Sequence, residues 1–197
     1  MRYTAKTWRW QDGLALWSFR IPSSAGEDLA QCLQRCVGGI MVNLQGFAEV
    51  GSVAVSTESG GEDAFEAIGA SQIRELDLEG LVARDSTAEI TMWLNLLVVV
   101  EPDTENTLLN NAAQLSVEAA DAGPGGGIAV DVTLSIDVDL YSPLTWGEDR
   151  NNRALAEING PRLTRFLAFL RDHLRGKLTL LDIEGYAGLG NETGFAL

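Results

Sequence analysis

The chain has 197 residues, of which 46% are hydrophobic and 21% charged, and this composition is typical of a globular protein and excludes an intrinsically disordered one. Its formal net charge of −14 argues against nonspecific binding of nucleic acid or of an anionic membrane by the whole protein, and it favours basic partners. The N-terminus lacks an apolar signal core and no apolar run reaches membrane-spanning length, so we expect a cytoplasmic protein that enters no membrane.

The charge is distributed unevenly along the chain. Residues 21–149 carry 22 acidic and 3 basic side chains, whereas residues 150–177 carry 7 basic and 2 acidic ones. In the more ordinary interpretation, the basic segment lies against an acidic sheet within the same chain. In the other interpretation, a surplus acidic surface meets a basic partner. The sequence leaves both open.

The first part of the chain predicts a hairpin and then a helix. Residues 1–22 alternate on both sides of the pair Asp12-Gly13, which is a strong local signal for a hairpin turn. A helix is expected over about 25–37, because acidic residues suit its first turn and a Gly-Gly pair follows it.

Two segments of similar build follow, and each consists of a strand, a turn and a long strand. The first covers about 73–100 and the second about 114–141, with a short helix expected between them over 105–113. The second segment ends in the longest alternating stretch of the chain, residues 128–141, which read IAVDVTLSIDVDLY. Its even positions are apolar and its odd positions mostly polar or acidic, so it predicts a strand with one dry face and one wet, acidic face.

The C-terminal part predicts a short helix over 150–158, a clear amphipathic helix over 161–175 with Pro161 in its first turn, and a last strand. The expected fold class is therefore α+β, with an antiparallel β-meander sheet packed by two main helices, about 25–37 and 161–175. We expect one domain over 1–197, with 185–197 as a flexible, glycine-rich tail.

Several kinds of catalytic site are disfavoured. His173 is the one histidine, and neither G-x-S-x-G nor a phosphate-binding glycine loop occurs. Cys32 and Cys36 are four residues apart in a predicted helix, a spacing that would strain a disulfide, so they are interpreted as buried small hydrophobic residues. No cofactor and no catalytic residue is expected.

The carboxylates of the long strand allow three interpretations. They form a solvated acidic face, a Ca²⁺ or Mg²⁺ site completed from a neighbouring segment, or one half of an acid–base pair, which would need a second carboxylate across a cleft. The strand residues concerned are Asp131, Asp137 and Asp139, and the candidate additional ligands are Glu101, Asp103 and Glu148.

The sequence favours a non-enzymatic acidic binding protein, like an inhibitor or immunity protein, that engages a basic protein partner. A loop tryptophan beside acidic residues is the favoured single contact. The expected partner-binding residues are Asp131, Asp137, Asp139, Trp146, Glu148 and Asp149. The alternatives are a structural subunit of a homo-oligomeric assembly and a carboxylate-based metal-dependent hydrolase.

Overall fold

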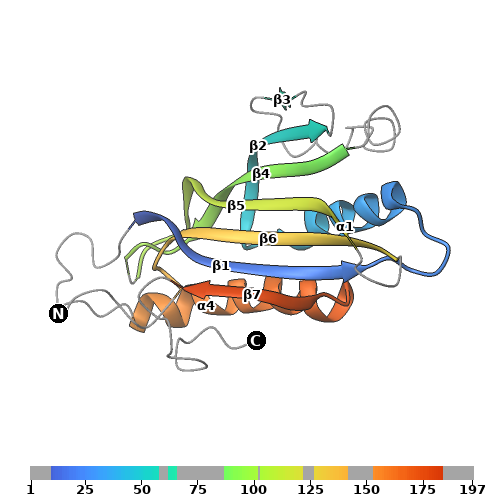
Figure 1. Cartoon of the computed structure of the whole chain (residues 1–197). Coiled ribbons are helices and arrows are strands. Elements are labelled where there is room, and N and C mark those ends of the chain that lie inside the picture. The colour runs from blue at the N-terminus through green and yellow to red at the C-terminus, as the bar shows by residue number, and fades with distance from the viewer. Residues whose placement is uncertain are drawn as a thin grey trace.

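The computed structural model describes residues 10–57, 62–65, 87–101, 103–121, 127–141 and 153–183. These residues confirm the α+β fold class (Figure 1). In chain order the elements are β1 (Trp10–Pro22), α1 (Leu29–Asn43), β2 (Ala48–Thr57), β3 (Glu62–Phe65), β4 (Thr87–Val98), β5 (Thr107–Asp121), β6 (Ile128–Val138), α4 (Arg153–Ala168), the π-helical turn η1 (Phe169–His173) and β7 (Lys177–Ile183).

The described strands form one antiparallel sheet in the order β3-β2-β4-β5-β6-β1-β7. β4, β5 and β6 follow one another in the chain and are neighbours in the sheet, as expected for a meander, and β2 lies between β3 and β4. β1 is the first strand of the chain, but it lies between β6 and the last strand, β7. The two ends of the described chain therefore meet at one edge of the sheet.

The two helices cover the same face of the sheet, behind the strands as Figure 1 is drawn. We call this the inner face and the opposite one the outer face. Inner-face side chains and the helices share one hydrophobic core. The largest fully buried side chains include Trp17, Phe19, Phe47, Tyr141 and Phe166. Within the described chain no helix lies on the outer face. The side chains of the outer face therefore differ in kind from those of the core.

Helix α1 is longer than expected and starts later. It begins after the N-cap residue Asp28, whose carboxylate accepts the backbone N–H of Gln31 in a capping box, and it continues to Asn43. The Gly-Gly pair does not end it. A Cβ on Gly39 would lie 3.1 Å from a ring atom of Phe169, so this glycine lets η1 approach the helix closely.

Helix α4 is one continuous helix where two were expected, and it passes through Pro161. Proline removes a helical hydrogen bond and is costly in a helix interior. Hydrogen bonds to other segments of the chain hold this turn of α4. The side chain of Asn159 accepts the N–H of Val99 at 2.9 Å and donates to the carbonyl oxygens of Val99 at 2.9 Å and Leu140 at 3.4 Å.

The expected turn at Asp12-Gly13 was wrong. Both residues lie inside β1, at a register shift between Trp10 and Ala15 in its pairing with β6. Gly13 has φ +64°, a conformation that glycine adopts without strain, and here it serves a bulge rather than a turn. The N–H of Gly13 donates to Asp137 Oδ1 at 2.8 Å, so a carboxylate of β6 holds the bulge.

Other expectations have mixed outcomes. The short helix over 105–113 was wrong, because β5 is a strand from Thr107 to Asp121. The expected strand over 73–84 and the tail over 185–197 lie outside the described residues, and so does the start of the first hairpin.

Candidate functional site

A row of charged side chains crosses the outer face of the sheet near one end of its strands. The strand registers place Glu89 of β4 opposite Glu118 of β5, Glu118 opposite Asp131 of β6, Asp131 opposite Arg20 of β1, and Arg20 opposite Lys177 of β7. We call these five residues the charged row. Directly opposed residues have Cβ atoms about 4.5–5.5 Å apart, so neighbouring charges in the row interact. Three carboxylates thus stand side by side, followed by two cations.

The boundary between the two signs is an ion pair. Arg20 donates from Nε and Nη2 to the two carboxylate oxygens of Asp131, at 2.9 Å and 2.7 Å. This two-point contact is the stronger form of an Arg–carboxylate pair. It occupies the carboxylate of Asp131, whose side chain is 16% exposed, while that of Arg20 is 45% exposed. The negative charge of Asp131 is therefore balanced by Arg20.

Glu118 stands between two like charges. Partial burial raises the pKa of its carboxyl above its ordinary value, and the charges of Glu89 and Asp131 raise it further. Within the described residues no ion pair joins Glu89 or Glu118 to a basic side chain. Glu89 accepts a hydrogen bond of 2.9 Å from the hydroxyl of Thr91. Among the described residues, the acidic end of the row therefore holds negative charge that no basic side chain balances.

Beside the charged row lies a row of hydroxyl side chains. Thr91, Ser116, Thr133 and Ser18 are opposed in register across four strands, and all four are half-buried. Thr133 donates its hydroxyl hydrogen to Ser18 Oγ at 3.0 Å. These short side chains leave a shallow polar surface between the charged row and the next row.

That next row contains the aromatic residue of the outer face. Trp93 of β4 is half-buried and lies opposite Gln114 of β5, which lies opposite Ser135 of β6. The alternation of β4 in the sequence could have found Trp93, because Met92 and Leu94 on either side of it point to the core. The outer face thus offers carboxylates, hydroxyls and one large aromatic ring on adjacent rows.

The three described residues of the expected set, Asp131, Asp137 and Asp139, do not form one exposed patch. Asp131 pairs with Arg20, and Asp137 accepts the N–H of Gly13. Asp139 is only 1% exposed, so its expected place on the wet face was wrong. The reason is that β6 ends at Val138, and the alternation of sides ends with it.

The remaining three expected contact residues, Trp146, Glu148 and Asp149, lie outside the described residues.

The basic segment 150–177 is built mainly into α4, η1 and the start of β7. Arg162 donates to the carbonyl oxygen of Leu97 and to Asn106 Oδ1, both at 2.6 Å. Arg171 pairs with its neighbour Asp172. Because α4 packs on the inner face, the described basic residues of α4 do not balance the acidic end of the charged row, and Lys177 is the described residue of this segment that belongs to the row.

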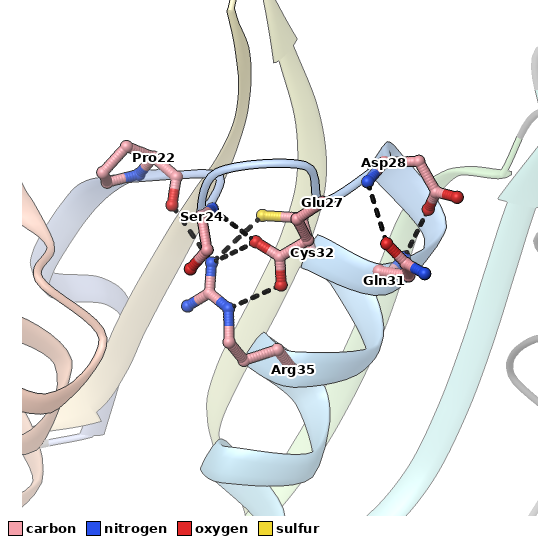
Figure 2. A network of polar contacts seen from close by, with 7 residues as sticks. All are labelled: Pro22, Ser24, Glu27, Asp28, Gln31, Cys32 and Arg35. Carbon is pink, nitrogen blue, oxygen red and sulfur yellow. Dashed lines mark hydrogen bonds and ion pairs between the residues drawn. The ribbon is translucent and has the colours of Figure 1, made fainter.

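A second polar network anchors the start of α1 (Figure 2). Arg35 donates from Nε and Nη2 to the two carboxylate oxygens of Glu27, at 2.8 Å and 3.0 Å, and from Nη2 to the carbonyl oxygen of Pro22 at 3.0 Å. Glu27 also accepts the N–H of Ser24 at 2.6 Å. The hydrogen bond from Arg35 is the main reason that the pKa of Glu27 is lowered. This network ties the helix to the end of β1, so its role is structural.

The two thiols beside this network are unsuited to nucleophilic chemistry. Cys32 and Cys36 are free and fully buried. Burial raises the pKa of both thiols, and that of Cys36 reaches about 12, so neither forms a thiolate at neutral pH. Arg35 Nη2 lies 3.4 Å from Cys32 Sγ, but its charge is held by Glu27. His173 is exposed and stacks on Phe169 in η1, with ring centroids 5.7 Å apart.

Comparison of the chain with protein-family models, with curated proteins and with solved structures finds no match. In the described part of the chain, no three His, Cys, Asp or Glu side chains are grouped so that they could hold a metal ion. No helix there has both the length and the apolar character to cross a bilayer. The side chains of the outer face are therefore the main indication of function.

Proposed function

We propose that this protein is a non-enzymatic acidic binding protein, of inhibitor or immunity type, and that it engages a basic protein partner through the outer face of its sheet. The observation that carries the proposal is the acidic end of the charged row, where Glu89 and Glu118 lack a cation within the described residues. A Lys or Arg side chain placed over them would relieve the like-charge repulsion that raises the pKa of Glu118.

The rest of the outer face is better suited to contact with another protein than to the binding of a small ligand. The hydroxyl row is shallow and offers hydrogen-bonding groups over four strands. Trp93 supplies an aromatic contact of the kind that is enriched in interface cores. The charge of the chain adds long-range attraction for a basic partner, which speeds association and makes it sensitive to salt.

The alternatives find less support. Extension of the sheet in a homo-oligomer would use β7, the last strand at one edge, where Leu180 is 51% exposed. The pairing of β7 with β1 has a register shift, however, and a bulged edge strand opposes the addition of another strand. A metal-dependent hydrolase would need the strand carboxylates to converge, whereas Asp131 and Asp137 are each held by a different group and Asp139 is buried.

The test is capture of partners from the native lysate on the immobilised full chain, at low and at moderate salt. We expect a basic protein that is released by salt. Replacing Glu89 and Glu118 together by Gln should weaken its capture. A matched variant with Glu101→Gln and Glu105→Gln removes the same charge at two exposed positions outside the charged row and should bind as the native chain does.

The proposal fails if the two double variants lose capture equally, because the charge would then act without the outer face. It also fails if the bait recovers only itself, and light scattering of the purified chain would then show whether it assembles with its own copies.

A further inference from the structure

A cavity of about 390 Å³ lies where the C-terminal end of α1 meets the beginning of β2. Its walls come from the last turn of α1, from the connection over 44–47, from the first residues of β2 and from one residue of β4. The lining side chains that matter here are Met41, Leu44, Gln45, Glu49, Val50 and Leu97. The volume falls within the range of about 300–1,000 Å³ that is usual for small-ligand sites.

Four large apolar side chains contribute to the walls of this cavity. Leu44 and Val50 are buried in the core, and Met41 and Leu97 are half-buried beside them. Because Leu44 and Val50 are already buried, an apolar group of modest size would remove mainly the exposed parts of Met41 and Leu97 from water. The cavity is therefore more than a gap between charged surface residues.

The polar groups of the cavity are all neutral or negative. Glu49 is exposed and lies at the cavity, and no described ion pair involves it. The C-terminal end of a helix carries a partial negative charge from its last carbonyl groups. The last turn of α1 contains no basic residue to balance that charge. A carboxylate and a helix C-terminus thus act together on whatever occupies the cavity.

We propose that this cavity binds an amphipathic cation, that is, an ammonium or guanidinium group carried on an apolar body. The apolar body packs against Met41 and Leu97, and the cation lies between Glu49 and the C-terminal end of α1. The inference does not depend on the function proposed above. The same chemistry can come from a free amine or from an Arg side chain of a basic protein, and the test separates these two sources.

The experiment uses the full chain with ¹³C-labelled methionine methyl groups and follows Met41 by NMR, with the fully buried Met92 as internal reference. The free probe is phenethylamine, and its neutral counterpart is phenethyl alcohol, which has the same ring and chain. The second cationic probe is a short peptide with blocked ends and one Phe-Arg pair. We expect a saturable shift of the Met41 methyl, with the amine bound roughly fivefold more tightly than the alcohol, as a partly exposed charge pair allows.

Variants test whether the carboxylate of Glu49 is the charge that attracts the cation. Glu49→Gln should lower the affinity for the amine to that for the alcohol and leave the affinity for the alcohol unchanged. The matched surface variant Glu101→Gln should change neither affinity. Binding of phenethylamine but not of the peptide assigns a free amine as the ligand type, and the reverse assigns an Arg side chain. The inference is overturned if neither cation shifts Met41, if the cation that shifts Met41 binds no more tightly than the alcohol, or if the two Glu→Gln variants behave alike towards that cation.

Discussion

Asn159 is the polar side chain on which the junction of helix and sheet depends, and replacing it should cost much of the stability of the protein. It is fully buried in α4 and is bonded to the N–H and the carbonyl of Val99 and to the carbonyl of Leu140. With Asn159→Ala these backbone groups remain buried and lose their partner. Three hydrogen bonds at about 1 kcal/mol each give a loss of roughly 3 kcal/mol, with more for each group that stays unsatisfied. That is a large part of a typical stability of about 5–15 kcal/mol.

Asn159→Asp tests the direction of these hydrogen bonds, because it keeps the shape of the side chain and replaces the amide NH₂ donor by an oxygen. A carboxylate can still accept the N–H of Val99, but it cannot donate to the carbonyl oxygens of Val99 and Leu140. Burial should raise the folded-state pKa of this carboxyl above its unfolded value of about 3.9. The variant is then least destabilised below the unfolded pKa, where the protonated acid can donate. Its stability relative to the native chain falls as pH rises through the folded pKa and is constant above it.

The assay is urea unfolding of the native chain and both variants between pH 4 and pH 8, followed by circular dichroism. Asn159→Ala should show a loss that does not change with pH relative to the native chain. Asn43→Ala is the control, since Asn43 is exposed and makes one hydrogen bond, to the carbonyl of Gly39. It should change the free energy of unfolding by about 0.5 kcal/mol or less. A neutral-pH stability of Asn159→Asp equal to that of the native chain would refute the bonding described here.

Three further predictions concern the bulge, the charged row and the thiols. Gly13→Ala should lower the free energy of unfolding by about 1–2 kcal/mol, because φ is +64° and no neighbouring atom crowds the new methyl group, and an unchanged urea midpoint would contradict this. Glu118→Gln should stabilise the protein at neutral pH, where the raised pKa of Glu118 makes its ionised form unfavourable, and the gain should vanish below the unfolded pKa. Glu105→Gln, at an exposed position outside the row, is the control and should leave the free energy of unfolding at neutral pH unchanged within about 0.5 kcal/mol. Cys32 and Cys36 should both resist Ellman's reagent in the native chain and react after unfolding in urea, so rapid labelling of the native chain would disprove their burial.

The sequence predicted the fold class because its strongest signals agree with the tertiary structure. The alternation predicted over 128–141 puts every second side chain from Val130 to Val138 into a core that the helices complete, and β6 begins at Ile128 as predicted but ends at Val138. The apolar stripe of the last helix likewise predicted the buried positions Leu163, Phe166 and Leu170. Long periodic patterns are reliable because a one-residue error would turn a whole face to the wrong side.

Local signals failed where long-range contacts compete with them. Asp12-Gly13 favours a tight turn in isolation, but here β1 continues through it because Trp10 pairs with Val138 of β6 and Asp137 of β6 accepts the N–H of Gly13. The Gly-Gly pair favours a helix end, but Gly39 is needed where Phe169 approaches. Pro161 favours a helix start, but Asn159 fixes the preceding turn to the sheet. In each case the glycine or proline has a tertiary role that its sequence neighbours do not reveal.

The candidate site was only partly predictable, because its chemistry depends on which residues lie opposite one another. The sequence indicated that Asp131 belongs to a wet strand face, but not that Arg20, separated from it by 111 positions, lies opposite and balances its charge. Nor could composition show that Glu118 stands between Glu89 and Asp131, since that follows from two strand registers at once. A shift of either register by one residue would bring Val117 or Ala119 to the outer face and remove the row. Among the described residues, the unbalanced charge is thus a property of the sheet rather than of any one strand. No pattern along the chain singles out Glu118, yet it is the position where the proposed basic partner would gain most.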